Sequence, residues 1–115
     1  MSTTETRNAV EAGRFVGSAI GRNYPSDILD AAKMCLVDWC GVALGAQNEE
    51  AAAAVRKVAM NWGTNGNAQV LRGDKAAPSA AAMINGTMAH CLDYDDTHVG
   101  STTHVSGPTV ASALA

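Results

Sequence analysis

Apolar residues recur along this chain at the three- and four-residue spacing of α-helices, with glycine-marked breaks between the runs. The first run covers residues 2–21 and opens on Ser2, with Glu5 at the position that completes a capping box. The second run begins at residues 25–27, where proline and aspartate suit a first helical turn, and it ends near Gly45. The pattern therefore predicts two helices in the first part of the chain.

The second predicted helix is apolar over most of its circumference. One stripe of residues recurs at helical spacing: Ile28, Ala32, Cys35, Leu36, Trp39 and Val42. Three further apolar side chains lie off that stripe: Leu29, Met34 and Val37. Because a helix at the surface usually keeps one polar face, we expect this helix to be buried.

A third helix is predicted over residues 49–62, with Gly63 as its C-terminal stop. One face of this helix is apolar and carries Val55, Val58, Ala59 and Trp62. Residues 68–71 have the composition of one short strand before a turn at residues 73–74. The sequence offers this strand no obvious partner, and a lone strand is not stable.

The fourth predicted helix runs from Pro78 to about Leu92 and consists mostly of small residues. Gly86 costs this helix about 1 kcal/mol relative to alanine, which indicates a close helix contact or a bend. A fifth helix is predicted to start at residues 107–108 and to continue to Ala115 without a cap or a terminating glycine.

The composition fits a single helical domain. The chain has 115 residues, of which 47% are hydrophobic and only 4% aromatic, and alanine supplies much of the apolar fraction. We therefore predict an all-α fold over residues 1–115, with about five helices and at most one short strand. Because the fifth helix lacks a stop signal, we expect a partial domain that is truncated at its C-terminal end.

Charge and cysteine content exclude several functional classes. A net charge of −3 provides no basic surface for nucleic acid, and no run of about 18 apolar residues predicts a transmembrane helix. The N-terminus lacks the cationic and apolar segments of a secretory signal. Three cysteines without a CxxC motif are typical of reduced thiols, so we expect a cytoplasmic protein with no nucleic-acid or membrane partner.

The side chains best suited to chemistry gather in residues 89–104. This segment holds all three histidines of the chain, His90, His98 and His104, and three of its aspartates. Histidine can transfer protons near neutral pH, and a neighbouring aspartate can fix its tautomer. Backbone amides at the start of the fifth helix could bind a carboxylate. Such clustering favours a functional site.

Three kinds of chemistry fit this segment. A metal site could use His90, Asp95, Asp96, His98 and His104, but no HExxH or similar spacing occurs. Residues 93–97 match the D-x-D-x-T string of aspartate-nucleophile phosphatases, yet that string should follow a buried strand and here follows a predicted helix. General acid–base chemistry on a carboxylate could use His104 or His98 together with Thr97 and Asp93.

Each of these residues also has a purely structural interpretation. Asp93 and Asp95 could end a helix and accept hydrogen bonds from loop amides, and Thr102 and Thr103 could be turn residues. The three cysteines could simply fill helix packing. Residue by residue, the structural interpretation stays open, and the case for a site depends on the cluster as a whole.

The motifs of the chain resemble those of the MmgE/PrpD family. Residues 78–98 combine an alanine-rich helix, the pattern N-G-x-x-x-H and the aspartate-rich turn D-Y-D-D-T, which is the most distinctive segment of that family. Upstream, residues 32–45 are similar to its second helix, which ends in G-V-A-L-x-G. Downstream, residues 104–108 resemble its H-x-S-x-P entry to the next helix.

The resemblance implies a fold and a chemistry. The family includes 2-methylcitrate dehydratase, cis-aconitate decarboxylase and iminodisuccinate epimerase, which are usually homodimers and need no metal or organic cofactor. Their large helical domain is joined by a smaller α+β lid domain, and the active site lies between the two. The resemblance therefore implies a lyase or isomerase that acts on a small polycarboxylic acid by histidine-mediated proton transfer, with this chain as the N-terminal part of the helical domain.

The resemblance also implies site residues. His104, Asp93 and Thr97 match positions that line the family's active site, so we predict that they are catalytic. His98 matches a histidine that follows D-D-T in many bacterial members, and we predict that His98 and Asp96 bind substrate.

No cationic clamp for a polycarboxylate is obvious in the sequence. Only Arg72 and Lys75 lie near the motif, and the family's later lysine and histidine positions lie beyond Ala115. We therefore expect the 115-residue chain alone to have no useful turnover. The alternative is a non-catalytic helical interaction module derived from the family, whose apolar second and fifth helices bury themselves in an assembly.

Overall fold

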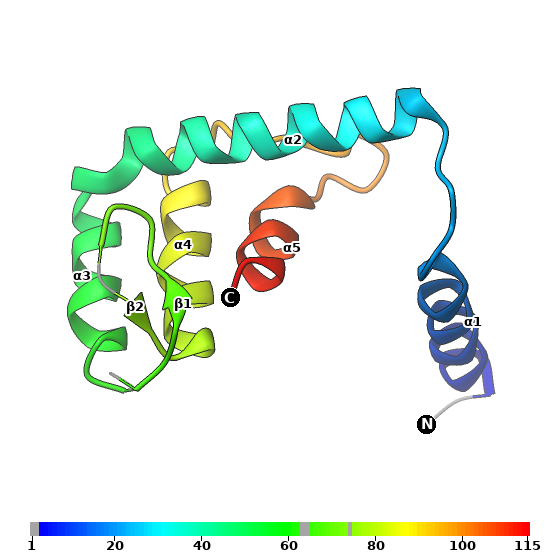
Figure 1. Ribbon diagram of the computed structural model, residues 1–115, viewed down its shortest axis with the longest axis horizontal. Coiled ribbons are helices and arrows are strands. Elements are labelled where there is room, and N and C mark those ends of the chain that lie inside the picture. Colours follow the sequence, from blue (N-terminus) through cyan, green and yellow to red (C-terminus); the bar gives the residue numbers. More distant parts are fainter. Residues whose placement is uncertain (1–2, 63–64, 74) are drawn as a thin grey trace. The chain divides into compact units, whose positions relative to one another are not determined.

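The computed structural model describes residues 3–62, 65–73 and 75–115 (Figure 1). Within these residues it has five α-helices: α1 (Thr3–Ala19), α2 (Ser26–Gly45), α3 (Glu50–Ala59), α4 (Pro78–His90) and α5 (Ser106–Ala113). A 3₁₀ turn, η1 (Ala46–Asn48), follows α2, and two short strands, β1 (Ala68–Gln69) and β2 (Lys75–Ala76), precede α4. The predicted all-α class is confirmed. No helix among the described residues has both the length and the apolar character needed to cross a bilayer.

The chain divides between Asp30 and Ala31 into two units. In the first unit, residues 7–18 of α1 are exposed, including the side chains of Phe15 and Val16, and so is Ile20 just after the helix. It ends at Ala19, close to the predicted position. The predicted capping box depends on Ser2, which lies outside the described residues.

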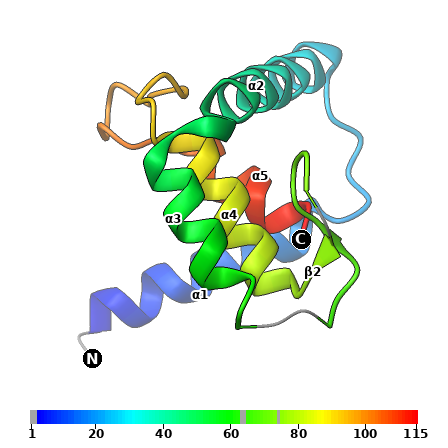
Figure 2. The ribbon, with the colours of Figure 1, turned by 90° about the vertical axis from the view of Figure 1, so that its left-hand side faces the viewer.

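The second unit holds the core, which is built around α4. This helix packs against α3 on one side and α5 on the other (Figure 2). The largest fully buried side chains of the core are Trp39, Ile84, Met88 and Val70, and most of the remaining core residues are alanines. Because each alanine removes little apolar area from water, the packing depends on close approach between helix backbones.

The small residues of α4 make that approach possible. Pro78 opens the helix at a position that needs no backbone N–H donor. A Cβ atom added to Gly86 would lie 3.5 Å from the Cβ of Ala111, an ordinary contact distance, so α5 packs directly against this part of α4. The prediction of a close helix contact at Gly86 is confirmed.

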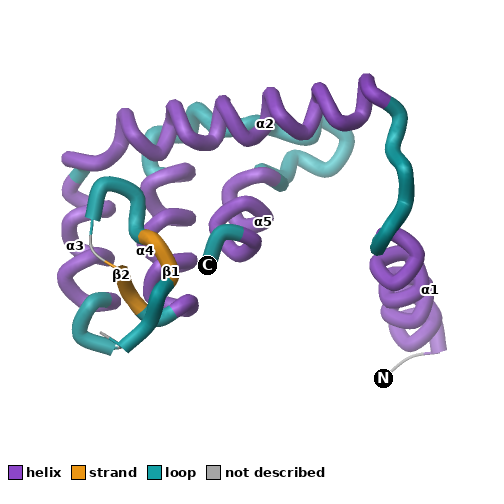
Figure 3. Tube along the Cα trace, in the orientation of Figure 1, coloured by secondary structure: helices purple, strands orange, loops and turns teal. Residues whose placement is uncertain are grey.

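The predicted strand has a partner, so the expectation that it would be unpaired was wrong. β1 pairs with β2 in antiparallel register, with Ala68 opposite Ala76 and Gln69 opposite Lys75 (Figure 3). Each strand is only two residues long, which is too short for an alternating sequence pattern to be visible. Gly66 lies so close to the backbone at Ala76 that any side chain there would collide with it.

A buried amide joins this hairpin to α4. The side chain of Asn85 accepts a hydrogen bond from the Leu71 N–H at 2.9 Å and donates one to the Gln69 carbonyl, also at 2.9 Å. Asn85 is only 1% exposed. Arg56 of α3 donates to the carbonyl of Leu71 at 3.3 Å, so two helices satisfy the polar groups of the same loop.

Two expectations about the helices need correction. The helix α2 was predicted to be buried, but Met34 and Val37 are 74% and 72% exposed, and its fully buried residues are Trp39 and Ala43. The cause is that only this narrow edge of α2 meets the described core, which leaves its other apolar faces uncovered. The helix α5 ends at Ala113 and does not continue to Ala115.

The third helix agrees with its prediction in part. The regular helix α3 ends at Ala59 and passes through a turn that includes Trp62. Of its predicted apolar face, Ala59 is buried, whereas Val58 and Trp62 are largely exposed. The predicted stop at Gly63 lies outside the described residues.

The buried amide of Asn85 leads to a stability prediction. In Asn85→Leu the Leu71 N–H and the Gln69 carbonyl lose their partner inside the core, which should lower the free energy of unfolding by about 2–4 kcal/mol. Urea unfolding followed by circular dichroism measures this change. The matched control is Asn61→Ala, because Asn61 is exposed and its side-chain amide donates to the carbonyl of Lys57, one turn earlier in the chain. Equal effects of the two substitutions would contradict a structural role for Asn85.

Candidate active site

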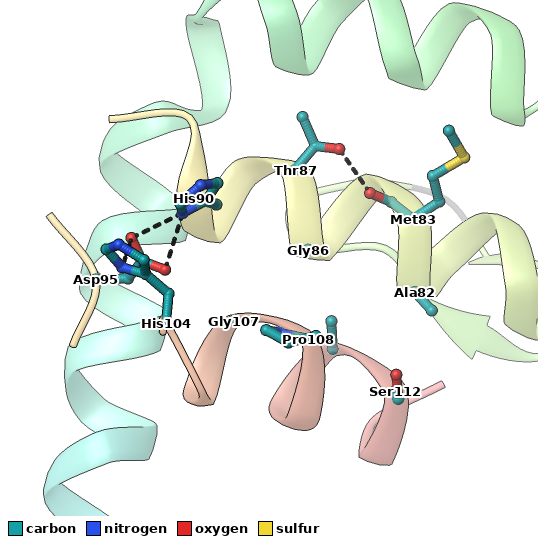
Figure 4. Close-up of a pocket in the computed structure, with 11 residues that line it drawn as sticks. Ala82, Met83, Gly86, Thr87, His90, Asp95, His104, Gly107, Pro108 and Ser112 are labelled. Carbon is teal, nitrogen blue, oxygen red and sulfur yellow. Dashed lines mark hydrogen bonds and ion pairs between the residues drawn. The ribbon is translucent and has the colours of Figure 1, made fainter. Parts of the chain in front are cut away.

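The end of α4 and the start of α5 form two walls of one pocket. Its volume is about 410 Å³. The residues that line it follow helical spacing on each wall: Ala82, Met83, Gly86, Thr87 and His90 from α4, and Gly107, Pro108, Ala111 and Ser112 from α5. Asp95 and His104, from the loop that connects the helices, close the remaining end (Figure 4). The pocket thus lies between α4 and α5, at the level where Gly86 faces Ala111.

A buried carboxylate organises the closed end. The side chain of Asp95 is 1% exposed, and both of its oxygens lie 3.1 Å from Nδ1 of His90. Burial of a carboxylate is costly unless it is paired and hydrogen-bonded. A Cβ atom on Gly107 would lie 3.3 Å from the Asp95 carboxylate, so the missing side chain leaves room for it. Asp95 can therefore hold His90 with a hydrogen on Nδ1 and a lone pair on Nε2.

His104 lies on the other side of Asp95. Its Nδ1 is 3.2 Å from an Asp95 oxygen, but this close contact lacks hydrogen-bond geometry and leaves the buried nitrogen without a hydrogen-bond partner among the described residues. Its Nε2 is 3.6 Å from a carboxylate oxygen of Asp93. The rings of His90 and His104 meet edge to face, with centroids 4.8 Å apart. Two imidazoles and two carboxylates therefore share one small volume.

The backbone at Asp93 turns the chain back toward α4. Asp93 has a left-handed conformation with φ of 55°, which aspartate tolerates better than most residues. Its N–H donates to the carbonyl of His90 at 2.9 Å. The residues that follow this reversal then bring Asp95 into contact with His90. Sequence alone did not indicate this reversal.

The predicted catalytic residues are only partly gathered in the cluster. Asp93 and His104 face each other there, as described above. Thr97 is exposed and does not line the pocket. Its hydroxyl lies 3.5 Å from the backbone carbonyl of Asp95, at the limit of a hydrogen bond. Its catalytic role stays a prediction.

The two predicted substrate-binding residues make contacts elsewhere. Both oxygens of Asp96 bind Ser106, one accepting from its N–H at 3.2 Å and the other from its hydroxyl at 2.8 Å, so Asp96 anchors the first turn of α5. His98 is exposed, and its Nδ1 lies 2.8 Å from the hydroxyl of Ser101. Neither residue lines the pocket. Substrate binding by Asp96 and His98 stays a prediction.

Two members of the cluster were not among the predicted catalytic or substrate-binding residues. From the sequence, His90 was a candidate metal donor, and Asp95 was a candidate metal donor, part of the D-x-D-x-T string or a structural residue at a helix end. A spacing of five residues across a helix end does not show whether the loop folds back. The available signal was the position of His90 at the end of a helix and the polarity of the loop after it.

The cluster also has a composition suited to metal ions. One donor atom from each of His90, Asp93, Asp95 and His104 lies within 4.8 Å of the others. Sequence spacing argued against a metal because no single helix carries the donors. The described structure draws them from a helix end and from both ends of a loop, which no linear spacing rule covers.

The structure also bears on the phosphatase hypothesis. The D-x-D-x-T string of residues 93–97 follows α4 and not a strand. In aspartate-nucleophile phosphatases the first aspartate of this string should stand at the end of a buried strand, so the required structural context is missing.

Cys91 lies directly after α4, beside the cluster. Its pKa is raised above the usual thiol value, chiefly by burial and secondly by the negative charge of Glu49. A raised pKa means less thiolate at neutral pH and hence a weaker nucleophile. Cys91 is therefore poorly suited to covalent catalysis, although it is next to a histidine.

The shift at Cys91 can be tested by alkylation. The rate at which iodoacetamide modifies Cys91, followed by peptide mass spectrometry, should still be rising as the pH passes 9.0, which is the ordinary pKa of a cysteine thiol. Glu49→Gln removes one of the causes and should move the profile to lower pH, whereas the neighbouring Glu50→Gln should not. Poor access alone would slow alkylation at every pH without moving the profile, and that result would count against the shift.

Comparison with known proteins places the chain in a family. It has no significant match among curated proteins or among solved structures. A family model does match: the MmgE/PrpD N-terminal domain, over residues 11–115, which is most of the chain. The matched segment includes α2 to α5 and the whole histidine–aspartate cluster. The chain therefore belongs to the MmgE/PrpD family and corresponds to its N-terminal domain.

Proposed function

We propose that this chain supplies the proton-transfer part of the active site of a cofactor-independent lyase or isomerase that acts on a small polycarboxylic acid. The observation that carries the proposal is the buried carboxylate of Asp95 between two histidines at the end of a pocket. Family membership adds support for the reaction class. Dehydration, decarboxylation and epimerisation next to a carboxylate are the candidate reactions.

These reactions share one chemical requirement. Loss of water, loss of CO₂ and inversion of a stereocentre beside a carboxylate all create or quench a carbanion-like centre. A group must therefore take a proton from carbon or give one to it. We assign that role to His104, which is partly exposed toward the pocket. Asp95 positions the two imidazoles, and Asp93 faces the second nitrogen of His104.

The pocket offers few groups that could bind the carboxylates of such a substrate. Its α5 wall begins in the first turn of a helix, at Gly107, where backbone dipoles favour an anion. The residues that line it include no lysine or arginine. Arg56 is engaged with the Leu71 carbonyl and the sulfur of Met88. A polycarboxylate would therefore need cations from outside the lining set.

The proposal predicts activity for the polypeptide purified from its source cells, at whatever mass it has there. In buffer with a chelator, it should dehydrate, decarboxylate or epimerise one of 2-methylcitrate, cis-aconitate or iminodisuccinate, measured by proton NMR. His104→Gln should lower kcat by about 10²–10⁴-fold, because it removes the proton carrier. Asn61→Ala, remote from the pocket, is the control.

The 115-residue chain alone provides the comparison. Without a cationic clamp it should show no useful turnover, because proximity and electrostatic stabilisation are both incomplete. Turnover by the chain alone that disappears in His104→Ala would overturn this expectation while supporting the reaction. A native polypeptide that is active but indifferent to His104→Gln would contradict the assignment of the site.

A second candidate function is a non-catalytic helical interaction module. The observation that favours it is the exposure of apolar side chains on α1 and α2, which includes Phe15 at 67% and Met34 at 74%. Exposed apolar surface of this extent marks interaction sites in soluble proteins.

Size-exclusion chromatography of the 115-residue chain discriminates between the two functions. A module should elute as one discrete oligomer over a wide range of loading concentrations, because its apolar faces pair in a defined way. The part of an enzyme site should instead give broad, concentration-dependent association. Met34→Glu, on the exposed face of α2, should disrupt a discrete oligomer, whereas Ser112→Glu provides a charge control on α5. An oligomer that is indifferent to Met34→Glu would argue against α2 as the interface.

A further inference from the structure

We propose that the cluster at the end of the pocket binds a divalent first-row transition-metal ion through His90, Asp95 and His104. The proposed ligands are Nδ1 of His90, one carboxylate oxygen of Asp95 and Nδ1 of His104. For His90 this requires the tautomer with its hydrogen on Nε2, so the ion takes the place of the proton that Nδ1 otherwise shares with Asp95. This inference goes beyond the proposed function, because it concerns ion binding by the chain itself and needs no turnover.

The distances between the donor atoms suit one ion. The Asp95 oxygens lie 3.1 Å from Nδ1 of His90, and one of them lies 3.2 Å from Nδ1 of His104. Ligand bonds of about 2.0–2.1 Å in tetrahedral geometry place neighbouring donor atoms about 3.3 Å apart. The two donor pairs that include Asp95 therefore need to move apart by only a few tenths of an ångström, and one donor atom from each residue of the cluster lies within 4.8 Å of the others. His90 is 56% exposed and has the freedom to make that adjustment.

The state of His104 is a second, independent indication. Its Nδ1 is buried and has no hydrogen-bond partner within the described part of the chain, although it lies close to a carboxylate. A buried polar atom without a partner is costly and calls for one. A cation between this nitrogen and Asp95 would satisfy both groups.

The surroundings of His104 resemble the outer shell of a metal site. When Nδ1 binds the ion, the opposite nitrogen Nε2 faces the carboxylate of Asp93 at 3.6 Å. A carboxylate on the far nitrogen is the usual way in which proteins orient a metal-binding histidine. Asp93 is thus assigned as an orienting residue, not as a ligand.

The donor set selects the class of ion. Two imidazoles and one carboxylate suit zinc, cobalt, nickel or iron, whereas magnesium and calcium prefer oxygen donors. Three protein ligands leave at least one coordination position open. His90, Asp95 and His104 all line the pocket, so that position faces the space in which a substrate would lie. An ion in this place would block the imidazole of His104 and inhibit proton transfer.

Cobalt(II) is the probe that tests the site directly. Titration of the 115-residue chain with Co²⁺ should give visible d–d absorption of tetrahedral intensity that saturates at one ion per chain. Zn²⁺ should displace the cobalt and bleach the band, and excess Mg²⁺ should not. His90→Gln and His104→Gln should each weaken Co²⁺ binding by at least about tenfold, and Asp93→Asn by about 10–100-fold through the outer shell.

The third histidine supplies the matched control. His98→Gln removes an imidazole from the same loop but outside the cluster, and it should leave the Co²⁺ affinity unchanged. Circular dichroism establishes that each variant is folded, and His90→Gln, at a half-exposed position, keeps the test informative if Asp95→Asn does not fold. Absence of the band, equal loss in His98→Gln, or a thiolate charge-transfer band from the cysteines would overturn the proposal. Because no substrate is present, its failure leaves the proposed function untouched.

Discussion

The organisation of the site depends on one buried charge. Asp95 is almost completely inaccessible, and no lysine or arginine lines the pocket beside it. Such a carboxylate can stay in the interior only if neighbouring groups pair with it. His90 does so with Nδ1 at 3.1 Å from both oxygens, and His104 lies against the same carboxylate at 3.2 Å without hydrogen-bond geometry. Asp95 therefore lies between the two ends of the connecting loop, where His90 and His104 meet edge to face.

Small residues make that arrangement sterically possible. Gly107 leaves room for the carboxylate, and Gly86 lets α5 approach α4 at the level of Ala111. Trp39 adds the link to α2, because its indole N–H donates to the carbonyl of Gly107 at 3.2 Å. The start of α5 is thus held from two directions, by Trp39 and by the Asp96 carboxylate on Ser106. Alanine buries little apolar area per residue, but its small side chain lets the two helix ends lie close enough to share a site.

The sequence predicted the long elements better than the contacts between them. Helical spacing, Pro78 and the breaks around glycine located α2, α3 and α4 to within a few residues, because these signals are local. The first short strand was predicted, but its partner β2 was missed, since pairing of so few residues depends on tertiary contacts such as those of Asn85. Family motifs pointed to Asp93 and His104, which do face each other. They did not indicate Asp95 as the central carboxylate, because its role arises from the left-handed turn at Asp93 and not from its own sequence neighbours.

Proton transfer and metal binding make the same demand on this cluster. Each requires an unprotonated imidazole nitrogen on a ring that a carboxylate holds in a fixed direction. Asp95 lies at Nδ1 of His90, and Asp93 faces Nε2 of His104 and so can leave Nδ1 of that ring unprotonated. The two uses cannot coexist on one nitrogen, because the lone pair that accepts a proton from carbon is the one that would bind an ion. A site that works without a cofactor in this arrangement must therefore prefer its organic anion to free transition metal. Under the proposed function, cations supplied by residues outside the pocket lining would favour this preference, because positive charge attracts a polycarboxylate and repels a metal ion.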